Sequence, residues 1–376
     1  MFFSYLTTAM SNLNKIVIHK PFKGKKLDIC HKGVKKYLLA TEEKKVCKLL
    51  QTFNAKEMDK QNIVICWDGG KSPYNLHISC NLQFTSERII NLNQSFWQAD
   101  LLFPNRTYYY KIVDCNGVSS VVDYFTTTSF YLRPITIGCA VNVRDCGGWI
   151  TENNQIVKYD KLYRGGRLDF SRKIEQDEEA IKHLNIKTEI DLRNPGGDDG
   201  GQTESSFGNQ TAYVRAPITQ GCYIFPFFKQ SQPYEREHDG RIPRSLRLVF
   251  EYLADEKNYP IYFHCNAGAD RTGTFAFLLN GLLGVSYEYL IKDFELTTFS
   301  EIGFRLRSEI KEGVFTDSGV MQDNYYNYVA FGKTYNLMMS AYSTKSGKLQ
   351  DSIKRYLVEV CDVTIENIEK FIKIML

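Results

Sequence analysis

The stretch His264-Cys-Asn-Ala-Gly-Ala-Asp-Arg-Thr-Gly273 decides the fold expected for the larger part of this chain. It follows the short apolar segment Pro260-Ile-Tyr-Phe-His264, which predicts a buried strand, and it leads into residues 272–283, which predict an apolar helix. A tight loop between a strand and a helix N-terminus directs backbone N–H groups and the helix dipole toward one point. The stretch therefore predicts an anion-binding loop in an α/β domain.

Each residue type in this loop suits a bound phosphate. Gly268 and Ala267 keep the loop narrow, and Arg271 can hold two phosphate oxygens with its planar guanidinium, which a lysine cannot do. The same positive groups favour a thiolate at Cys265, and a thiolate can attack phosphorus to form a phosphocysteine. We predict Cys265 as the nucleophile and Arg271 as the phosphate clamp; the alternative, an inert core thiol, leaves the surrounding residues unexplained. The substrate-binding residues predicted around them are Asn266, Ala267, Gly268, Ala269 and Thr272.

The string His-Cys-x-x-Gly-x-x-Arg-Thr-Gly resembles the signature of the protein tyrosine phosphatase superfamily, and all its defining positions match. The resemblance covers about residues 135–376, and it is similar in particular to bacterial tyrosine phosphatases that include dual-specificity and phosphoinositide-active members. It implies a phosphatase domain with a central, mostly parallel sheet flanked by helices, which needs no metal or other cofactor. The further matching segments are Asn142-Val-Arg-Asp-Cys-Gly-Gly148, Lys161-Leu-Tyr-Arg-Gly-Gly-Arg-Leu168, Ile186-Lys-Thr-Glu-Ile-Asp-Leu-Arg193, Gly284-Val-Ser-Tyr-Glu-Tyr-Leu290 and Val363-Thr-Ile-Glu-Asn-Ile368.

Phosphate transfer to a cysteine releases an oxyanion, to which a protonated carboxyl group is expected to donate. No Trp-Pro-Asp segment, the usual site of that acid in phosphatases with a separate mobile loop, occurs in the chain. In the branch that this chain resembles, an Asp just before the loop Arg is a candidate acid, and Asp270 occupies that position. Asp198 and Asp199 are alternative acids on a Gly/Asp-rich loop that could close over the substrate. For all three, a turn-shaping or solvated role is the competing interpretation.

One loop position bears on the substrate. Relatives often carry a lysine just before the Asp, which adds charge for multiply phosphorylated lipids, but this chain has Ala269. The resemblance therefore implies phosphotyrosine in proteins as the first choice of substrate. A phosphoinositide phosphatase and a non-catalytic phosphate-binding adaptor remain as alternatives.

Several charged residues outside the loop are predicted to support it. His264 is expected to orient or tune the thiol rather than act as a base. Buried arginines are rarely unpaired, so four charged residues in the matching segments are expected to form buried ion pairs or anchor loops, with contact to substrate as the alternative. These residues are Arg144, Asp145, Arg164 and Arg193.

The region of residues 50–128 predicts a small β-sandwich, because short aromatic and β-branched runs alternate with turn signals. Leu102-Phe-Pro-Asn-Arg-Thr-Tyr-Tyr-Tyr-Lys-Ile-Val113 and Asp123-Tyr-Phe-Thr-Thr127 resemble the late strands of fibronectin type III modules. That resemblance implies a recognition or spacing role, with a protein as partner. The predicted organisation is a lysine-rich segment at 1–48, a β-sandwich at 49–130 and a phosphatase domain at 135–376.

Charge and cysteine content restrict the partners and the cellular compartment expected for the protein. A net charge of +4 over 376 residues does not indicate nucleic acid. Residues 15–48 carry eleven Lys against three acids, which predicts a solvated segment or, alternatively, a surface for an anionic partner such as lipid headgroups. The ten cysteines form no dense framework and no Cys-x-x-Cys pair, which favours reduced thiols, a cytoplasmic protein and no zinc site. The apolar stretch in residues 1–9 is too short to span a membrane, and an export signal there is the minority alternative.

Overall fold

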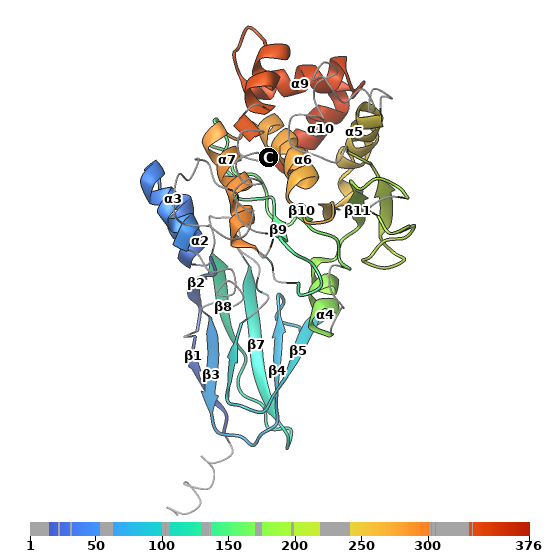
Figure 1. Ribbon diagram of the computed structural model, residues 1–376. Coiled ribbons are helices and arrows are strands. Elements are labelled where there is room, and N and C mark those ends of the chain that lie inside the picture. Colours follow the sequence, from blue (N-terminus) through green and yellow to red (C-terminus); the bar gives the residue numbers. More distant parts are fainter. Residues whose placement is uncertain are drawn as a thin grey trace, which may run out of the picture. The chain divides into compact units, whose positions relative to one another are not determined.

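The computed structural model describes residues 15–21, 23–30, 32–52, 63–99, 102, 106–128, 135, 137–169, 175–196, 199–218, 241–300, 302, 305, 331–332 and 334–376. The chain forms two compact units. The first, here called the β unit, comprises Met1–Lys32 and Lys56–Phe130, and the second, the α/β unit, comprises Gly33–Ala55 and Tyr131–Leu376 (Figure 1).

The β unit consists of two sheets around one apolar core. Alternation along the strands builds this core: Tyr108, Tyr110 and Ile112 point inward from one strand, as a period of two requires. All strand pairs are antiparallel except β2–β8, which is parallel. One sheet has the order β1 (Val17–Lys20), β3 (Val64–Asp68), β6 (Phe96–Gln98), and the other has the order β2 (Lys25–Asp28), β8 (Asp123–Thr128), β7 (Thr107–Asp114), β4 (Tyr74–Ser79), β5 (Glu87–Leu92).

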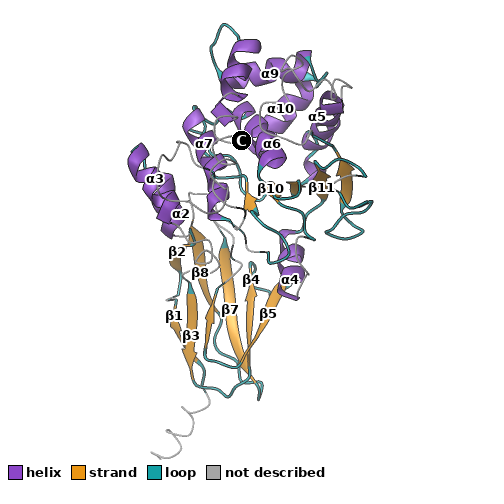
Figure 2. Ribbon diagram, viewed as in Figure 1, coloured by secondary structure: helices purple, strands orange, loops and turns teal. Residues whose placement is uncertain are grey.

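The α/β unit has a five-stranded mixed sheet with helices (Figure 2). Its central strand, β13 (Ile261–His264), is fully buried, which accounts for the continuous apolar run at this place in the sequence. Four of the strands are parallel, and β9 is antiparallel to β10. The order is β12 (Ala212–Arg215), β11 (Thr188–Asp191), β13 (Ile261–His264), β10 (Leu162–Gly165), β9 (Arg144–Asp145).

Helix α6 follows the central strand and is buried from Arg271 to Leu282, so its apolar composition fills the middle of the unit. The last helix begins at a side-chain cap: the Thr364 hydroxyl accepts a hydrogen bond of 3.2 Å from the N–H of Asn367. In the described part of this unit, the helices that follow β9 include α4 (Glu175–Leu184), α5 (Arg241–Leu253), α6 (Asp270–Leu282), α7 (Tyr287–Glu295), α9 (Leu349–Glu359) and α10 (Ile365–Met375), with the 3₁₀ turns η4 (Glu256–Asn258) and η5 (Leu296–Phe299). Among the described residues, no helix combines the length and the apolar character needed to cross a membrane.

The lysine-rich segment contributes to both units. Strands β1 and β2 belong to the β unit, whereas helices α2 (Lys32–Leu39) and α3 (Glu43–Thr52) belong almost wholly to the α/β unit. Within that unit Tyr37 is completely buried, and its hydroxyl donates to Glu295 Oε2 at 2.6 Å.

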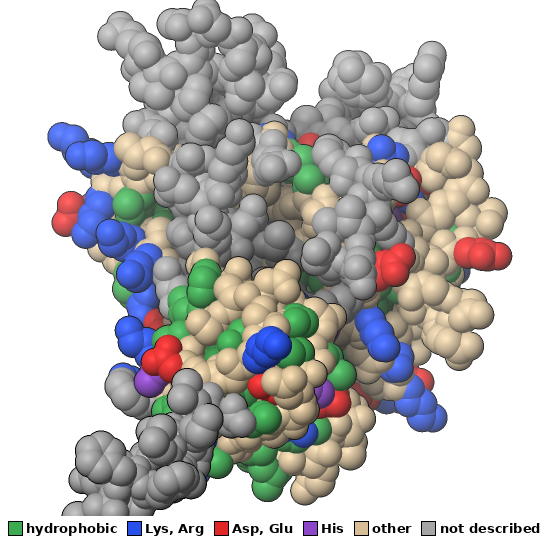
Figure 3. All heavy atoms as spheres, turned by 90° about the horizontal axis from the view of Figure 1, so that it is seen from below, with side chains coloured by type: hydrophobic (Ala, Val, Ile, Leu, Met, Phe, Trp, Pro, Cys, Tyr) green, Lys and Arg blue, Asp and Glu red, His purple; other side chains and the backbone are tan. Residues whose placement is uncertain are grey.

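The lysines of α2 and α3 lie on the outside of these helices, since their polar heads stay hydrated while residues such as Val34 and Tyr37 are buried. On the face drawn in Figure 3, basic side chains gather along the left side, and a smaller group of them lies at the lower right. The exposed lysines of α2 and α3 are Lys32, Lys36, Lys44, Lys45 and Lys48.

Candidate active site

The predicted phosphate loop joins β13 to α6. Cys265 directly follows the strand and is 3% exposed, and Arg271 lies in the first turn of the helix and is 6% exposed. Gly268 has φ +67°, and a Cβ at this position would lie 2.3 Å from the carbonyl carbon of Gly165. Only glycine fits, because the loop is seated against the backbone at the end of β10.

The carbonyl oxygens of the loop are held by donors from neighbouring segments. Gly268 O accepts hydrogen bonds of 3.0 Å from both Asn142 Nδ2 and Arg164 Nη2, and Asn266 O accepts one of 3.1 Å from Arg167 N. Engaging these oxygens removes groups that would repel an anion. The loop and the N-terminus of α6 therefore have the donor arrangement that suits an anion.

A buried cluster of two arginines and one aspartate supports the loop from the side of β9, β10 and α7. Arg144 Nε lies 3.3 Å from Asp293 Oδ1, and Arg164 forms an ion pair with Asp293 Oδ2. Burial and the neighbouring charge of Arg164 lower the pKa of Arg144 to about 10, against the opposing effect of Asp293. The buried ion pairs expected for Arg144 and Arg164 are thus present, and one carboxylate serves both.

Asp293→Ala is expected to lower the free energy of unfolding by about 3–5 kcal/mol, because it leaves two buried guanidinium groups without their shared carboxylate. Urea denaturation followed by circular dichroism measures the loss. Glu369→Ala is the control, since Glu369 lies 3.6 Å from Lys354 in an exposed pair whose removal changes stability little. Equal losses in the two variants would show that Asp293 does not hold the cluster together.

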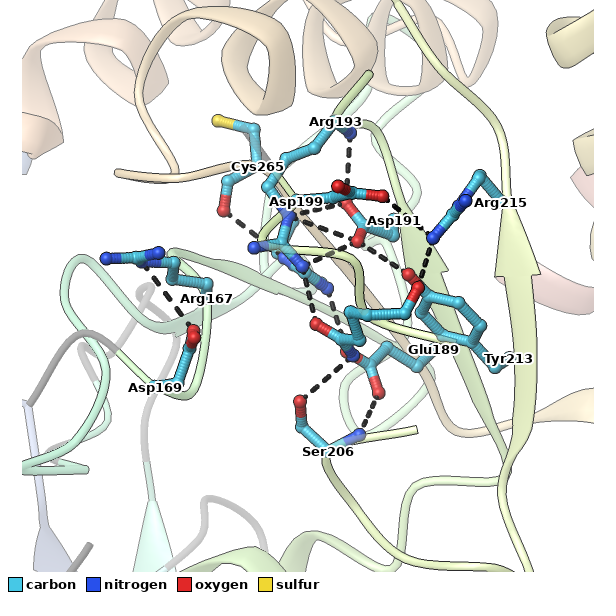
Figure 4. Close-up of polar contacts among 12 residues, drawn as sticks. Arg167, Asp169, Glu189, Asp191, Arg193, Asp199, Ser206, Tyr213, Arg215 and Cys265 are labelled. Carbon is cyan, nitrogen blue, oxygen red and sulfur yellow. Dashed lines mark hydrogen bonds and ion pairs between the residues drawn. The ribbon is translucent and has the colours of Figure 1, made fainter. Parts of the chain in front are cut away.

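A second buried pair lies beneath Cys265. His264 and Glu189 are both fully buried, and His264 Nε2 is 2.8 Å from Glu189 Oε1. The other carboxylate oxygen accepts hydrogen bonds of 2.6 Å from Ser205 Oγ and from Ser206 N. His264 Nδ1 lies 3.2 Å from the carbonyl oxygen of Cys265. Figure 4 shows the Cys265 sulfur pointing away from these polar groups, which therefore form a supporting layer under the loop.

A third pair continues this layer along β11. Arg193 Nη2 lies 2.6 Å from Asp191 Oδ2, and that oxygen also accepts a hydrogen bond of 2.8 Å from Tyr213 (Figure 4). Both members of the ion pair are fully buried, as expected for Arg193.

Asp145 is a loop anchor: its carboxylate accepts hydrogen bonds from the N–H groups of Gly147 at 2.7 Å and Asp160 at 2.8 Å.

The candidate acids have different surroundings. Asp270 opens α6 with its side chain 40% exposed, and its Oδ1 lies 3.5 Å from Arg305 Nη2. Asp199 is 3% exposed, accepts hydrogen bonds from Gly201 N at 3.0 Å and Gly196 N at 3.1 Å, and pairs with Arg215 at 2.8 Å. The backbone hydrogen bond from Gly201 is the main reason that the pKa of Asp199 lies below its usual range.

These contacts keep Asp199 ionised and give it a structural role. A general acid, in contrast, must carry a proton before it can donate one. Asp198 lies outside the described residues. Arg305, beside Asp270, was not found by sequence reasoning, because it lies 35 positions farther along and no motif surrounds it.

Thr272 is fully buried in the first turn of α6. Within the described part of the chain its hydroxyl has no hydrogen-bond partner. Since a buried hydroxyl normally has one, this group is available to a ligand or to the Cys265 sulfur. Of the remaining predicted binding residues, Asn266 and Ala267 are partly exposed and Ala269 is buried.

Comparisons with known proteins agree on the family. A model of the tyrosine phosphatase family matches residues 135–376. A protein named as a putative tyrosine-protein phosphatase, from Cupriavidus necator, is 29% identical over 164 residues, covering 41% of this chain and 59% of that protein. A tyrosine-protein phosphatase from Nostoc commune is 25% identical over 137 residues, covering 34% of this chain and 46% of that protein. The chain thus spans less than two thirds of both curated relatives.

A solved structure gives a weaker match. The core catalytic domain of the PP-IP phosphatase SIW14 from S. cerevisiae, in complex with citrate, is 17% identical and covers 40% of this chain and 78% of its own. The TM-score is 0.26, which supports no inference about this chain.

Proposed function

This chain belongs to the tyrosine phosphatase family over residues 135–376, and on that basis we propose that it hydrolyses phosphate monoesters through a phosphocysteine on Cys265. The observation that carries the proposal is the path from β13 through the loop into α6. Cys265 directly follows the strand and Arg271 lies in the first turn of the helix, so both residues flank one loop at a helix N-terminus, which supports the proposal. A nucleophile and a cation in that setting suit phosphoryl transfer, which depends on positioning and charge stabilisation.

In the proposed reaction the Cys265 thiolate attacks phosphorus, and the bond from phosphorus to the ester oxygen breaks. Asp270 gives its proton to the departing oxygen, while Arg271 binds two of the non-bridging oxygens. In the second step water attacks the phosphocysteine, Asp270 takes up the proton of the water, and phosphate leaves. The Thr272 hydroxyl donates to the sulfur as it departs. Asp270 must separate from Arg305 to exchange its proton in this way.

Phosphotyrosine in proteins is the proposed substrate. Both curated relatives are named as tyrosine-protein phosphatases. Ala269, which is 2% exposed, brings no charge to the loop, whereas a substrate with several phosphates needs additional cations. A single phosphate on an aromatic ring therefore suits the loop best.

The test is to assay the full chain on p-nitrophenyl phosphate, a phosphotyrosine peptide and soluble inositol phosphates. We expect turnover of the first two, unaffected by a chelator and abolished by vanadate or mild oxidation of the thiol. Faster turnover of inositol phosphates would replace the substrate assignment. If the wild-type chain hydrolyses none of these compounds but binds phosphate, the adaptor alternative holds instead.

Asp270→Asn is expected to lower kcat for an alkyl phosphate by about 10²-fold or more, the usual contribution of a general acid. The loss should be smaller for p-nitrophenyl phosphate, because p-nitrophenolate leaves without a proton. Asp199→Asn is the matched comparison and should show no such dependence on the leaving group. If Asp199→Asn shows the dependence and Asp270→Asn does not, Asp199 is the acid.

For the β unit we propose a fibronectin type III-like recognition module. The antiparallel order β1-β3-β6 packed on a sheet containing β8-β7-β4-β5 supports this proposal. Ile89 and Phe96 are each 47% exposed on it and offer contacts to a protein. Replacing both by Lys should lower turnover of a phosphorylated protein substrate but leave turnover of p-nitrophenyl phosphate unchanged. Unchanged turnover of both would contradict the recognition role.

A further inference from the structure

We infer that Glu189 is a positioning residue for the proposed reaction: it keeps His264 as an imidazolium, which in turn holds the backbone carbonyl of Cys265. This inference rests on the proposed function for its kinetic consequence. Its structural basis is independent, because it follows from the hydrogen-bond partners of one histidine ring.

Both ring nitrogens of His264 face acceptors. Nε2 lies 2.8 Å from the Glu189 carboxylate, and Nδ1 lies 3.2 Å from the carbonyl oxygen of Cys265. A neutral imidazole has one donor and one acceptor, so it could satisfy only one of these contacts. The imidazolium has two donors and satisfies both. The ring is fully buried, so water does not offer a substitute partner.

The carboxylate is held in its ionised form by several donors. Ser205 Oγ and Ser206 N each donate to Glu189 Oε2 at 2.6 Å, and Gln202 Nε2 donates to Oε1 at 3.2 Å. Burial alone would raise the pKa of Glu189, but the hydrogen bond and charge of His264, together with the serine donors, outweigh burial and lower it. A charged acceptor therefore faces Nε2.

Two other charges near the ring act on it in opposite directions. Asp191, on the same strand as Glu189, favours the imidazolium, and Arg193, which pairs with Asp191, opposes it. Tyr262, on the same strand as His264, places its ring 5.7 Å away. Burial would lower the pKa of His264, but the hydrogen bond and charge of Glu189 outweigh it and raise that pKa. The positive charge thus persists to a higher pH than for an ordinary histidine.

The consequence for catalysis is twofold. A buried positive charge lies one residue before the nucleophile, where it adds to that of Arg271 in favouring the thiolate. The Nδ1–H group also fixes the peptide at which the phosphate loop begins, so the loop amides keep their direction. Both effects disappear when the imidazolium loses its proton, and activity should then fall on the alkaline side.

The direct experiment records long-range ¹H–¹⁵N spectra of the imidazole rings in the full chain across a pH series. The chain has six histidines, and His264 is assigned by its loss in His264→Asn. We expect the His264 ring to keep the imidazolium signature above neutral pH, whereas in the isosteric Glu189→Gln it becomes neutral. A His264 ring that is neutral at neutral pH in the wild type would overturn the inference, whether or not the protein is an active phosphatase.

The kinetic experiment follows kcat/KM for p-nitrophenyl phosphate against pH. Removing an opposite charge next to a titrating group shifts its pKa by about 1–3 units, so the alkaline limb for Glu189→Gln should move down by about that amount. Ser205→Ala removes a hydrogen bond from the same carboxylate but leaves its charge, and its alkaline limb should stay in place. A merely structural role for Glu189 would lower activity equally at every pH, and that result would contradict the inference.

Discussion

Cys265→Ser is expected to reduce turnover of p-nitrophenyl phosphate by a factor on the order of 10⁴–10⁶, the loss typical of removing a nucleophile. Serine is nearly isosteric, so the loop, Arg271 and the N-terminus of α6 remain in place. A hydroxyl, however, is not ionised by the charges that stabilise a thiolate, so it cannot attack phosphorus at a comparable rate. Phosphate binding, measured by isothermal titration calorimetry, should therefore survive the loss of turnover.

The control for this variant is Cys80→Ser, which replaces an exposed cysteine of the β unit. It should retain full activity and the same melting temperature. If Cys265→Ser also keeps most of its activity, another residue is the nucleophile and the phosphocysteine mechanism is wrong. If it loses phosphate binding together with turnover, the loop depends on the sulfur for its shape, and the assignment of the anion site to backbone groups fails.

The phosphate loop was predictable because its determinants are local. Gly268 takes a positive φ that favours glycine, the apolar residues of β13 require burial, and the helix must begin where the loop ends. All of these constraints lie within about twenty consecutive residues of the sequence. The sequence therefore predicted the strand, loop and helix together, and the family match covers the same region.

The layer that supports the loop was only partly predictable, because its contacts join distant residues. Arg144 and Arg164 lie 149 and 129 positions from Asp293, the carboxylate that they share. The expected burial of these arginines predicts that they need acidic partners, but it does not predict which aspartate or glutamate of the chain is the partner. Tyr37 is an extreme case: it contacts Glu295, which is 258 positions away, although it lies in a lysine-rich segment for which the sequence predicts either a solvated segment or a surface for an anionic partner.

The loop around Asp199 shows a different limit. Its glycines and aspartates predict a flexible segment in which a carboxylate could move over the substrate. In the structure the N–H groups of Gly196 and Gly201 converge on Asp199, and Arg215 adds its charge. Glycines that make a loop flexible in an unfolded chain also let its backbone wrap closely around an anion. Composition alone cannot distinguish these two outcomes.

Arg271→Lys is expected to lower kcat/KM for p-nitrophenyl phosphate by a factor on the order of 10³, comparable with the loss of an arginine that stabilises a phosphoryl-transfer transition state. The substitution keeps the positive charge but removes the planar pair of donors that binds two oxygens at once. Arg271 is 6% exposed, so the shorter, strongly hydrated ammonium group must also lose water to enter the site. Most of the effect should fall on kcat, because the geometry matters most as charge spreads over the equatorial oxygens.

Arg247→Lys is the matched control, because Arg247 lies on α5 of the same unit with its side chain 50% exposed and a loose 3.9 Å contact to Asp362. It should leave kcat/KM unchanged, which would show that exchanging an arginine for a lysine is not harmful in itself. If Arg271→Lys is also near wild type, positive charge alone suffices and the two-oxygen clamp is wrong. If Arg271→Lys loses activity only through a higher KM, the guanidinium binds substrate and transition state equally, and the stabilisation of transferring phosphate must come from the loop amides.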